Sequence, residues 1–129
     1  MNLLLYATEP RGTGKQLQKV IEDLFPENNT EIYRTIDGLS HRLRQPRYDL
    51  AVVILLAASK QDLLDLLSIR DLIDDLRVIL LLPNREKDTI TKGHTLRPRF
   101  LTYTDSNLLD VAAVPSKMVR NTHRDKKRG

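Results

Sequence analysis

The sequence predicts a layered α/β domain built on a parallel five-stranded sheet, and three observations support this prediction. The segment 48–58, YDLAVVILLAA, is an almost unbroken apolar run rich in Val and Ile, which is typical of a strand that is buried on both faces. Such a strand needs a covering layer above and below, and helical patterns both precede and follow it. With 129 residues, the chain is long enough for one domain with a real core and too short for two ordinary ones.

The first third of the chain contains two predicted strands with a helix between them. Residues 3–7 form an apolar run that predicts a buried strand, and residues 31–36 predict a more polar strand at the sheet edge. The helix between them carries apolar residues at helical spacing on one face, namely Leu17, Val20, Ile21 and Leu24. Thr13 and Gln16 have the spacing of a capping box, which predicts that this helix begins after Thr13.

Two further helices are predicted on either side of the central strand. Asp37 is expected to cap a short helix that carries Leu39 and Leu43. After the central strand, Ser59 is expected to cap a third helix, with Asp62 at its third position. The apolar stripe of this third helix consists of Leu63, Leu66, Leu67 and Ile73.

The remaining pattern completes an alternation of five strands with five helices. Residues 77–82 predict a fourth strand, residues 87–94 a weak helix and residues 100–104 a fifth strand. Asp105 or Ser106 can cap a last helix. Because crossovers between parallel strands are right-handed, this element order favours a doubly wound, flavodoxin-like fold of three layers with strand order 2-1-3-4-5.

Charge divides the chain into a body, residues 1–119, and a basic tail, residues 120–129. The net charge is +4, yet six of the 21 basic residues and one of the 17 acidic residues lie within 116–129. Residues 1–115 therefore carry about −1, and the basicity belongs to the end of the chain. We expect the tail to be disordered, and we favour a solubilising or linker role over nucleic-acid binding because it lacks aromatic residues that would stack on bases.

Several classes of protein do not fit this composition. No apolar run approaches the length of a membrane span, and the N-terminus lacks the features of a signal peptide, so we expect a cytoplasmic protein without a membrane partner. The absence of cysteine removes disulfides and thiolate catalysis. The three histidines, His41, His94 and His123, are far apart in sequence, and we expect no metal site and no cofactor.

The strand pattern resembles response-regulator receiver domains over nearly the whole body, to about residue 114. The segments LLLYATEP, YDLAVVI, RVILLLP and RFLTYT occupy the places of that family's first, third, fourth and fifth strands. At the ends of these strands the family places metal-binding acids, an Asp that accepts phosphate, a hydroxyl group and a lysine. The corresponding residues of this chain are Ala7 and Thr8, Ile54, Leu82, and Tyr103 or Thr104.

The resemblance implies a pseudo-receiver that cannot accept phosphate on Asp. No acidic residue occurs within 50–60, so shifting the alignment by one or two residues does not restore the acceptor. Phosphoryl transfer in receivers needs clustered carboxylates around a divalent cation, and these are missing at the matching positions. We therefore expect a non-catalytic regulatory or protein-interaction domain. By the same resemblance, its partner or dimer surface would include Tyr103, Leu108 and Val111.

An alternative function is the binding of a small anion or a nucleotide by the loop Glu9–Lys15. The segment RGTGK suggests a phosphate loop but completes neither the Walker pattern nor the dinucleotide fingerprint. The free N–H groups of a helix N-terminus, together with Lys15, would still favour an anion.

Two charged patches of opposite sign are predicted on the surface, and they permit association with a second copy of the chain. The acids of the third helix predict a solvated face or a partner surface, and they are Asp62, Asp65, Asp71, Asp74 and Asp75. A positive patch is predicted around the second helix, from Arg42, Arg44 and Arg47, and patches of opposite sign permit self-association. We expect Asp49 to be a solvated capping residue at the opposite end of the sheet from Glu9.

Overall fold

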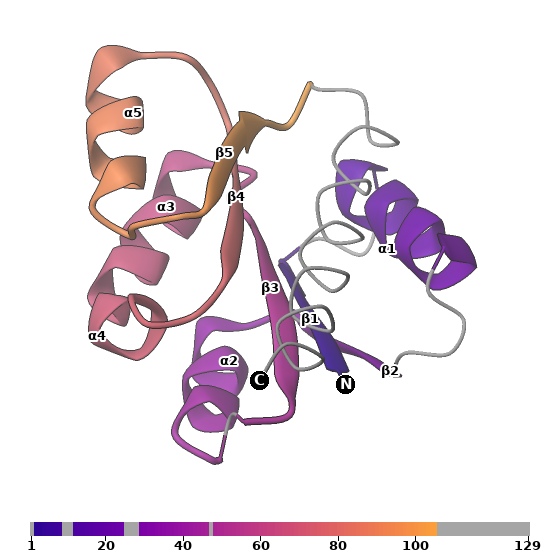
Figure 1. Cartoon of the computed structure of the whole chain (residues 1–129). Helices are drawn as coiled ribbons and strands as arrows, with labels where there is room; N and C mark the ends of the chain where they lie inside the picture. Colours follow the sequence, from indigo (N-terminus) through magenta and orange to yellow (C-terminus); the bar gives the residue numbers. More distant parts are fainter. Residues whose placement is uncertain (1, 9–11, 25–28, 47, 106–129) are drawn as a thin grey trace, which may run out of the picture.

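The described part of the chain is organised around one parallel sheet of five strands. The computed structural model describes residues 2–8, 12–24, 29–46 and 48–105 (Figure 1). Within these ranges the strand order is β2-β1-β3-β4-β5, so the predicted flavodoxin-like fold class and strand order are confirmed. The elements in chain order are β1 (Asn2–Ala7), α1 (Gly12–Leu24), β2 (Asn29–Tyr33), α2 (Ile36–Leu43), β3 (Leu50–Leu56), α3 (Lys60–Ser68), α4 (Arg70–Ile73), β4 (Val78–Leu82), α5 (Lys87–His94) and β5 (Phe100–Tyr103).

Apolar side chains alternate between the two faces of the sheet and form two separate core layers. In β1, Leu4 and Tyr6 belong to one layer and Leu3 and Leu5 to the other. Helices α2, α3, α4 and α5 cover the first face, and α1 lies on the second (Figure 1). Strands β1, β3 and β4 are almost completely buried, whereas β2 and β5 are partly exposed. The second strand is therefore an edge strand, as predicted from its polar residues.

The predicted start of the first helix is wrong. Helix α1 begins at Gly12, so Thr13 lies inside the helix and the capping box with Gln16 does not mark its N-terminus. Gly12 has a φ of +63°, in the left-handed region that favours glycine, and the chain therefore turns into the helix before Thr13 is reached. The expected apolar face is present nonetheless, because Leu17 and Ile21 are fully buried.

The predicted cap of the second helix is also wrong, by two residues. Thr35 caps α2, and its side chain accepts a hydrogen bond from the backbone N–H of Gly38 at 3.0 Å. Asp37 lies in the first turn instead. The strand β2 ends at Tyr33 and not at residue 36, so the chain is already free to begin the helix at Ile36.

The predicted third helix is divided into two. Ser59 caps α3 as predicted and accepts a hydrogen bond from the backbone N–H of Asp62 at 3.2 Å. The helical backbone is interrupted at Ile69, which has φ −116° and ψ 23°, before α4 begins. Ser68 and Ile69 are only moderate helix formers, and the interruption still leaves Ile73 fully buried in the core.

The last described elements agree with the sequence pattern. Residues 87–94 form α5, and this helix lies close to the sheet at Gly93, where an added Cβ would be 3.1 Å from the Leu82 side chain. The predicted final helix, the disordered tail and the boundary at residue 119 lie outside the described residues. Among the helices of the described ranges, none combines the length and the apolar character needed to span a membrane.

Candidate functional site

Four of the residues that correspond to receiver site positions lie at the carboxyl edge of the sheet. Open parallel sheets bind ligands at this edge. Ala7 ends β1 and is paired with Leu56, the last residue of β3. Leu82 and Tyr103 end β4 and β5 and are paired with each other. Thr8 follows β1 directly. This edge is therefore the first candidate site.

Ile54 lies away from this edge, in the interior of β3. It is fully buried and paired with both β1 and β4, two residues before the strand ends. The pairing of β1 with β3 skips Ala51, which adds one residue to β3 ahead of Ile54. At the end of β3 the chain places Leu56 and Ala57, which are both apolar and buried.

Asp62 is the residue at this edge that sequence reasoning assigned wrongly. Its Oδ2 accepts a hydrogen bond from Thr8 Oγ1 at 3.0 Å and another from the Ala58 backbone N–H at 3.1 Å. Asp62 is only 8% exposed, so it does not belong to the solvated negative face, whereas Asp71, Asp74 and Asp75 are exposed. The spacing from Ser59 to Asp62 could have indicated this contact, because the side chain of an acid three residues after a helix cap can accept a hydrogen bond from the backbone before the helix.

The carboxylate of Asp62 also acts on a buried tyrosine of β1. Tyr6 is fully buried in the core layer beneath α3. Burial, together with the nearby carboxylates of Asp62 and Asp65, raises the pKa of Tyr6 to about 12. Tyrosine is neutral at physiological pH in any case, and burial together with these carboxylates disfavours the ionisation of Tyr6 further.

The arrangement at the ends of β1 and β3 is a closed hydrogen-bonded corner. The Oδ2 atom of Asp62 is engaged by two donors, and the neighbouring ends of the strands are apolar. Over the ranges that the structure describes, no three His, Asp or Glu side chains come together in a group that could hold a metal ion. Glu9 lies outside those ranges. The described residues thus supply packing and hydrogen bonds at this corner.

The ends of β4 and β5 carry an ordered charged cluster next to Tyr103. The Arg85 guanidinium lies over the Tyr103 ring, 4.2 Å from its centroid. Arg85 also donates two hydrogen bonds to Asp105, at 2.7 and 2.9 Å, which lowers the pKa of that carboxyl group. Both charged side chains are exposed. Leu108 and Val111, the other residues of the predicted partner surface, lie outside the described residues.

A groove beside α1 includes Lys15, the last residue of the loop that was considered for anion binding. Its volume is about 370 Å³, and it is lined by Lys15, Gln18, Lys19, Glu22 and Arg34. Arg34 donates hydrogen bonds to the Ala7 carbonyl at 3.1 Å and to Gln18 Oε1 at 3.2 Å. Among the described residues, the groove therefore combines one tethered guanidinium with two lysines and a single carboxylate.

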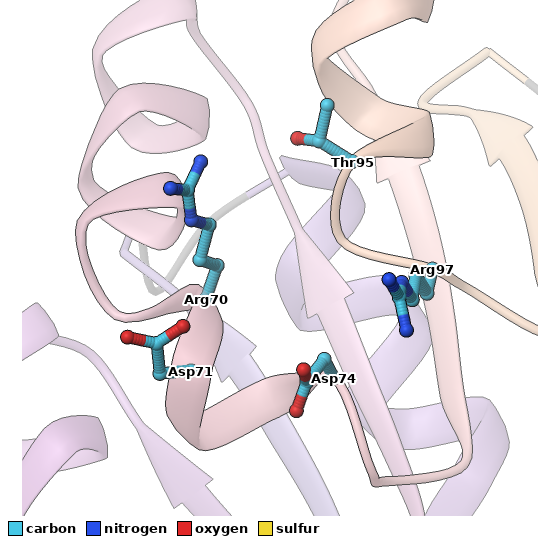
Figure 2. Close-up of a pocket in the computed structure, with 5 residues that line it drawn as sticks. All are labelled: Arg70, Asp71, Asp74, Thr95 and Arg97. Carbon is cyan, nitrogen blue, oxygen red and sulfur yellow. The ribbon is translucent and has the colours of Figure 1, made fainter.

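A second hollow lies between α4 and the turn that follows α5. Its volume is about 380 Å³, and it is lined by Arg70, Asp71, Asp74, Thr95 and Arg97. Figure 2 shows the three α4-side residues on one side of the hollow and Thr95 and Arg97 on the other. The lining is charged, with two basic and two acidic side chains. Sequence reasoning did not anticipate this hollow, because its two walls are separated along the chain.

The opposite, amino edge of the sheet holds a network that overturns two sequence predictions. Arg42 is 8% exposed and does not form part of a positive surface patch. It donates to both carboxylate oxygens of Glu31, at 2.7 and 3.2 Å, and to Asp49 at 3.1 Å. Asp49 is accordingly an ion-pair partner and not a cap, although its side chain remains 43% exposed, and it also accepts a hydrogen bond from Asn2. Arg44 is exposed, and Arg47 lies outside the described residues.

This network shifts the titration of its members. The hydrogen bonds from Arg42 hold the pKa of Glu31 below its usual value, and bonds from Asn2 and Tyr33 act in the same direction. The same contacts raise the pKa of Arg42. Each partner therefore favours the charged form of the other, which is the behaviour of a structural ion-pair network.

Comparison with known proteins adds no relative to this picture. No family model matches the chain, and no curated protein matches it.

Proposed function

We propose that this chain is a regulatory protein-interaction domain that uses a receiver-like scaffold without accepting phosphate. One observation carries the proposal. At the corner between β1 and β3, apolar strand ends and the engaged carboxylate of Asp62 occupy the region in which a receiver would hold its acids. The flavodoxin-like fold is consistent with this function but is shared by many unrelated activities, so the site carries the argument.

The proposed partner surface is the exposed side of β5. Arg85 lies over the Tyr103 ring and is hydrogen-bonded to Asp105, so an aromatic ring and two charged groups lie next to one another. Arginine and tyrosine are enriched among the residues that dominate protein interfaces. The partner would be another protein or a second copy of this chain.

The absence of phosphate acceptance is tested by incubating the full chain with acetyl phosphate and Mg²⁺ and measuring its intact mass. We expect the mass to remain unchanged, because residues 50–60 contain no acid and the carboxylate of Asp62 is already engaged by Thr8 and Ala58. A receiver domain with an intact acceptor Asp serves as the positive control. A covalent gain of one phosphoryl group would contradict the proposal.

The interaction surface is tested by sedimentation of the full chain, with Tyr103→Ala compared against the wild type across a salt series. We expect a salt-resistant complex that is weakened by the substitution, because apolar contacts are not screened by salt. Leu64→Ala is the control, since Leu64 is an exposed apolar residue of α3 and not of β5. If the wild type remained a monomer in every condition, self-association would be excluded and only a different protein partner would remain.

A second candidate function is the binding of a small anion in the groove beside α1. The tethered Arg34 and the two lysines favour a phosphate group there. Titration with inorganic phosphate tests this function, with Lys15→Gln and Lys19→Gln combined in one variant. We expect saturable binding that is lost in the double variant, and binding that persists unchanged would assign the phosphate to another site.

A further inference from the structure

The hollow of Figure 2 brings together charges of both signs from two distant segments of the chain. One wall is the α4 region, with Arg70, Asp71 and Asp74, and the other is the turn that carries Thr95 and Arg97. The volume of about 380 Å³ lies at the lower end of the range for sites that bind small molecules. The hollow is thus large enough for a compact ligand.

The four charged side chains of the hollow are not engaged with other side chains. Across the ranges described here, Arg70, Asp71, Asp74 and Arg97 form no ion pair and no side-chain hydrogen bond. Elsewhere on the surface, pairs such as Lys92 with Asp88 do satisfy each other. These four charged groups therefore remain available to a ligand, whereas the Thr95 hydroxyl already donates to the Lys92 carbonyl at 2.6 Å.

Arg97 occupies a backbone position that would suit glycine better. Its φ of +52° makes it the single non-glycine residue with positive φ among the described residues. The Cβ of an L side chain is crowded in this region, so the conformation is unfavourable for arginine. The turn imposes this conformation, because Arg97 N–H donates to the His94 carbonyl at 3.0 Å and Leu96 is fully buried beside it. A strained side chain at the wall of a hollow is an observation from which a function can be inferred.

We infer that this hollow binds a small zwitterion, a molecule that carries one carboxylate and one ammonium group. The guanidinium groups of Arg70 and Arg97 match a carboxylate, with which arginine forms paired hydrogen bonds. The carboxylates of Asp71 and Asp74 match an ammonium group, which only donates hydrogen bonds. An amino acid or a dipeptide has both groups and fits the volume. This site is independent of the proposed interaction surface on β5.

The probe for this inference is the dipeptide alanyl-alanine, titrated into the isotope-labelled full chain and followed by amide NMR. We expect saturable shifts at residues 70–74 and 95–97. Two blocked dipeptides are the controls, because N-acetylation removes the ammonium group and C-terminal amidation removes the carboxylate. Each should bind at least tenfold more weakly, equivalent to about 1.4 kcal/mol. The inference is overturned if alanyl-alanine produces no saturable shift at millimolar concentration, or if the blocked forms bind equally well.

The substitution Arg97→Gly separates the role of the side chain from the fold. Glycine relieves the left-handed backbone, so the variant should be at least as stable as the wild type while binding alanyl-alanine at least tenfold more weakly. Arg99→Ala, which changes an exposed arginine that does not line the hollow, should bind normally. Unchanged binding by the stable Arg97→Gly variant would overturn the assignment.

A second variant tests the carboxylate side of the hollow. In Asp74→Asn the ammonium partner is weakened and the arginines remain, so the preference for alanyl-alanine over its N-acetyl form should diminish. The preference over the C-terminal amide should persist. If both preferences stayed as in the wild type, Asp74 would not contact the ammonium group and the proposed mode of binding would be wrong.

Discussion

Arg42 joins three separate segments at the amino edge of the sheet through a side chain that is only 9% exposed. Removing it in Arg42→Ala leaves Glu31 without its main partner and Asp49 without its ion pair. Loss of one partner of a buried pair costs 3–5 kcal/mol, but these carboxylates are 23% and 43% exposed, so we expect a loss of about 2 kcal/mol. This loss is measured by comparing the urea unfolding of Arg42→Ala with that of the wild type. Arg44→Ala, at an exposed position of the same turn, should change stability by less than about 0.5 kcal/mol.

The same network predicts how stability depends on acid pH. The folded-state pKa of Glu31 lies below its ordinary value of 4.5, because Arg42 stabilises the carboxylate. This stabilisation is fully present above pH 4.5 and is lost as the pH falls through the folded-state pKa. The difference in unfolding free energy between the wild type and Arg42→Ala should therefore shrink in acid. A difference that stays constant from pH 7 to pH 3 would show that the ion pair is not its source.

Asp62 closes the opposite, carboxyl edge by accepting hydrogen bonds from Thr8 and Ala58. Asp62→Asn replaces a charged acceptor with a neutral one, and we expect a loss of about 1–2 kcal/mol in urea unfolding. It should also lower the pKa of Tyr6, since Asp62 contributes to raising it. Asp71→Asn is the control, because Asp71 is exposed and has no such contacts. If the two substitutions had equal effects, Asp62 would not be a specific structural link.

At the scale of single elements, α2 shows how the start of a helix is decided by the end of the preceding strand. Thr35 accepts the N-terminal hydrogen bond, and Asp37 lies within the first turn. Thr35→Ala should therefore cost about 1 kcal/mol, whereas Thr35→Ser should retain most of the cap. Asp37→Ala should cost less, because Asp37 contributes only through the helix dipole. Thermal unfolding of the three variants distinguishes these cases, and a larger effect at residue 37 would reverse the assignment.

The wrong predictions for elements share a cause in the backbone. The capping rule at Thr13 and Asp37 considers only side chains that could accept a hydrogen bond. The observed starts follow instead from the left-handed Gly12 and from the early end of β2 at Tyr33. The division of the third helix at Ile69 is similar, because the apolar spacing continues through the interruption and conceals it.

At the scale of the whole molecule, burial predicts an uneven distribution of local stability. Strands β1, β3 and β4 are buried along almost their whole length, whereas β2 and β5 are partly exposed. Amides of the three central strands should exchange with solvent only through global unfolding, and those of β2 and β5 should exchange faster through local opening. Native-state hydrogen exchange measures these differences between the strands. Protection in β5 equal to that in β3 would contradict the expected gradient.

The sequence by itself determined the five strands, their order in the sheet and the absence of acidic residues at the end of β3. These features depend on local spacing of apolar residues and on the handedness of crossovers, which act through neighbouring residues and whole elements. The tertiary structure decided which charged residues are buried. Thr8 and Asp62 are 54 positions apart, and Asn2 and Asp49 are 47 apart. The walls of the hollow around Arg97 likewise come from separate segments. Whether a charged side chain faces water or a partner depends on which segments pack against it. The spacing of residues along the chain does not indicate such distant contacts.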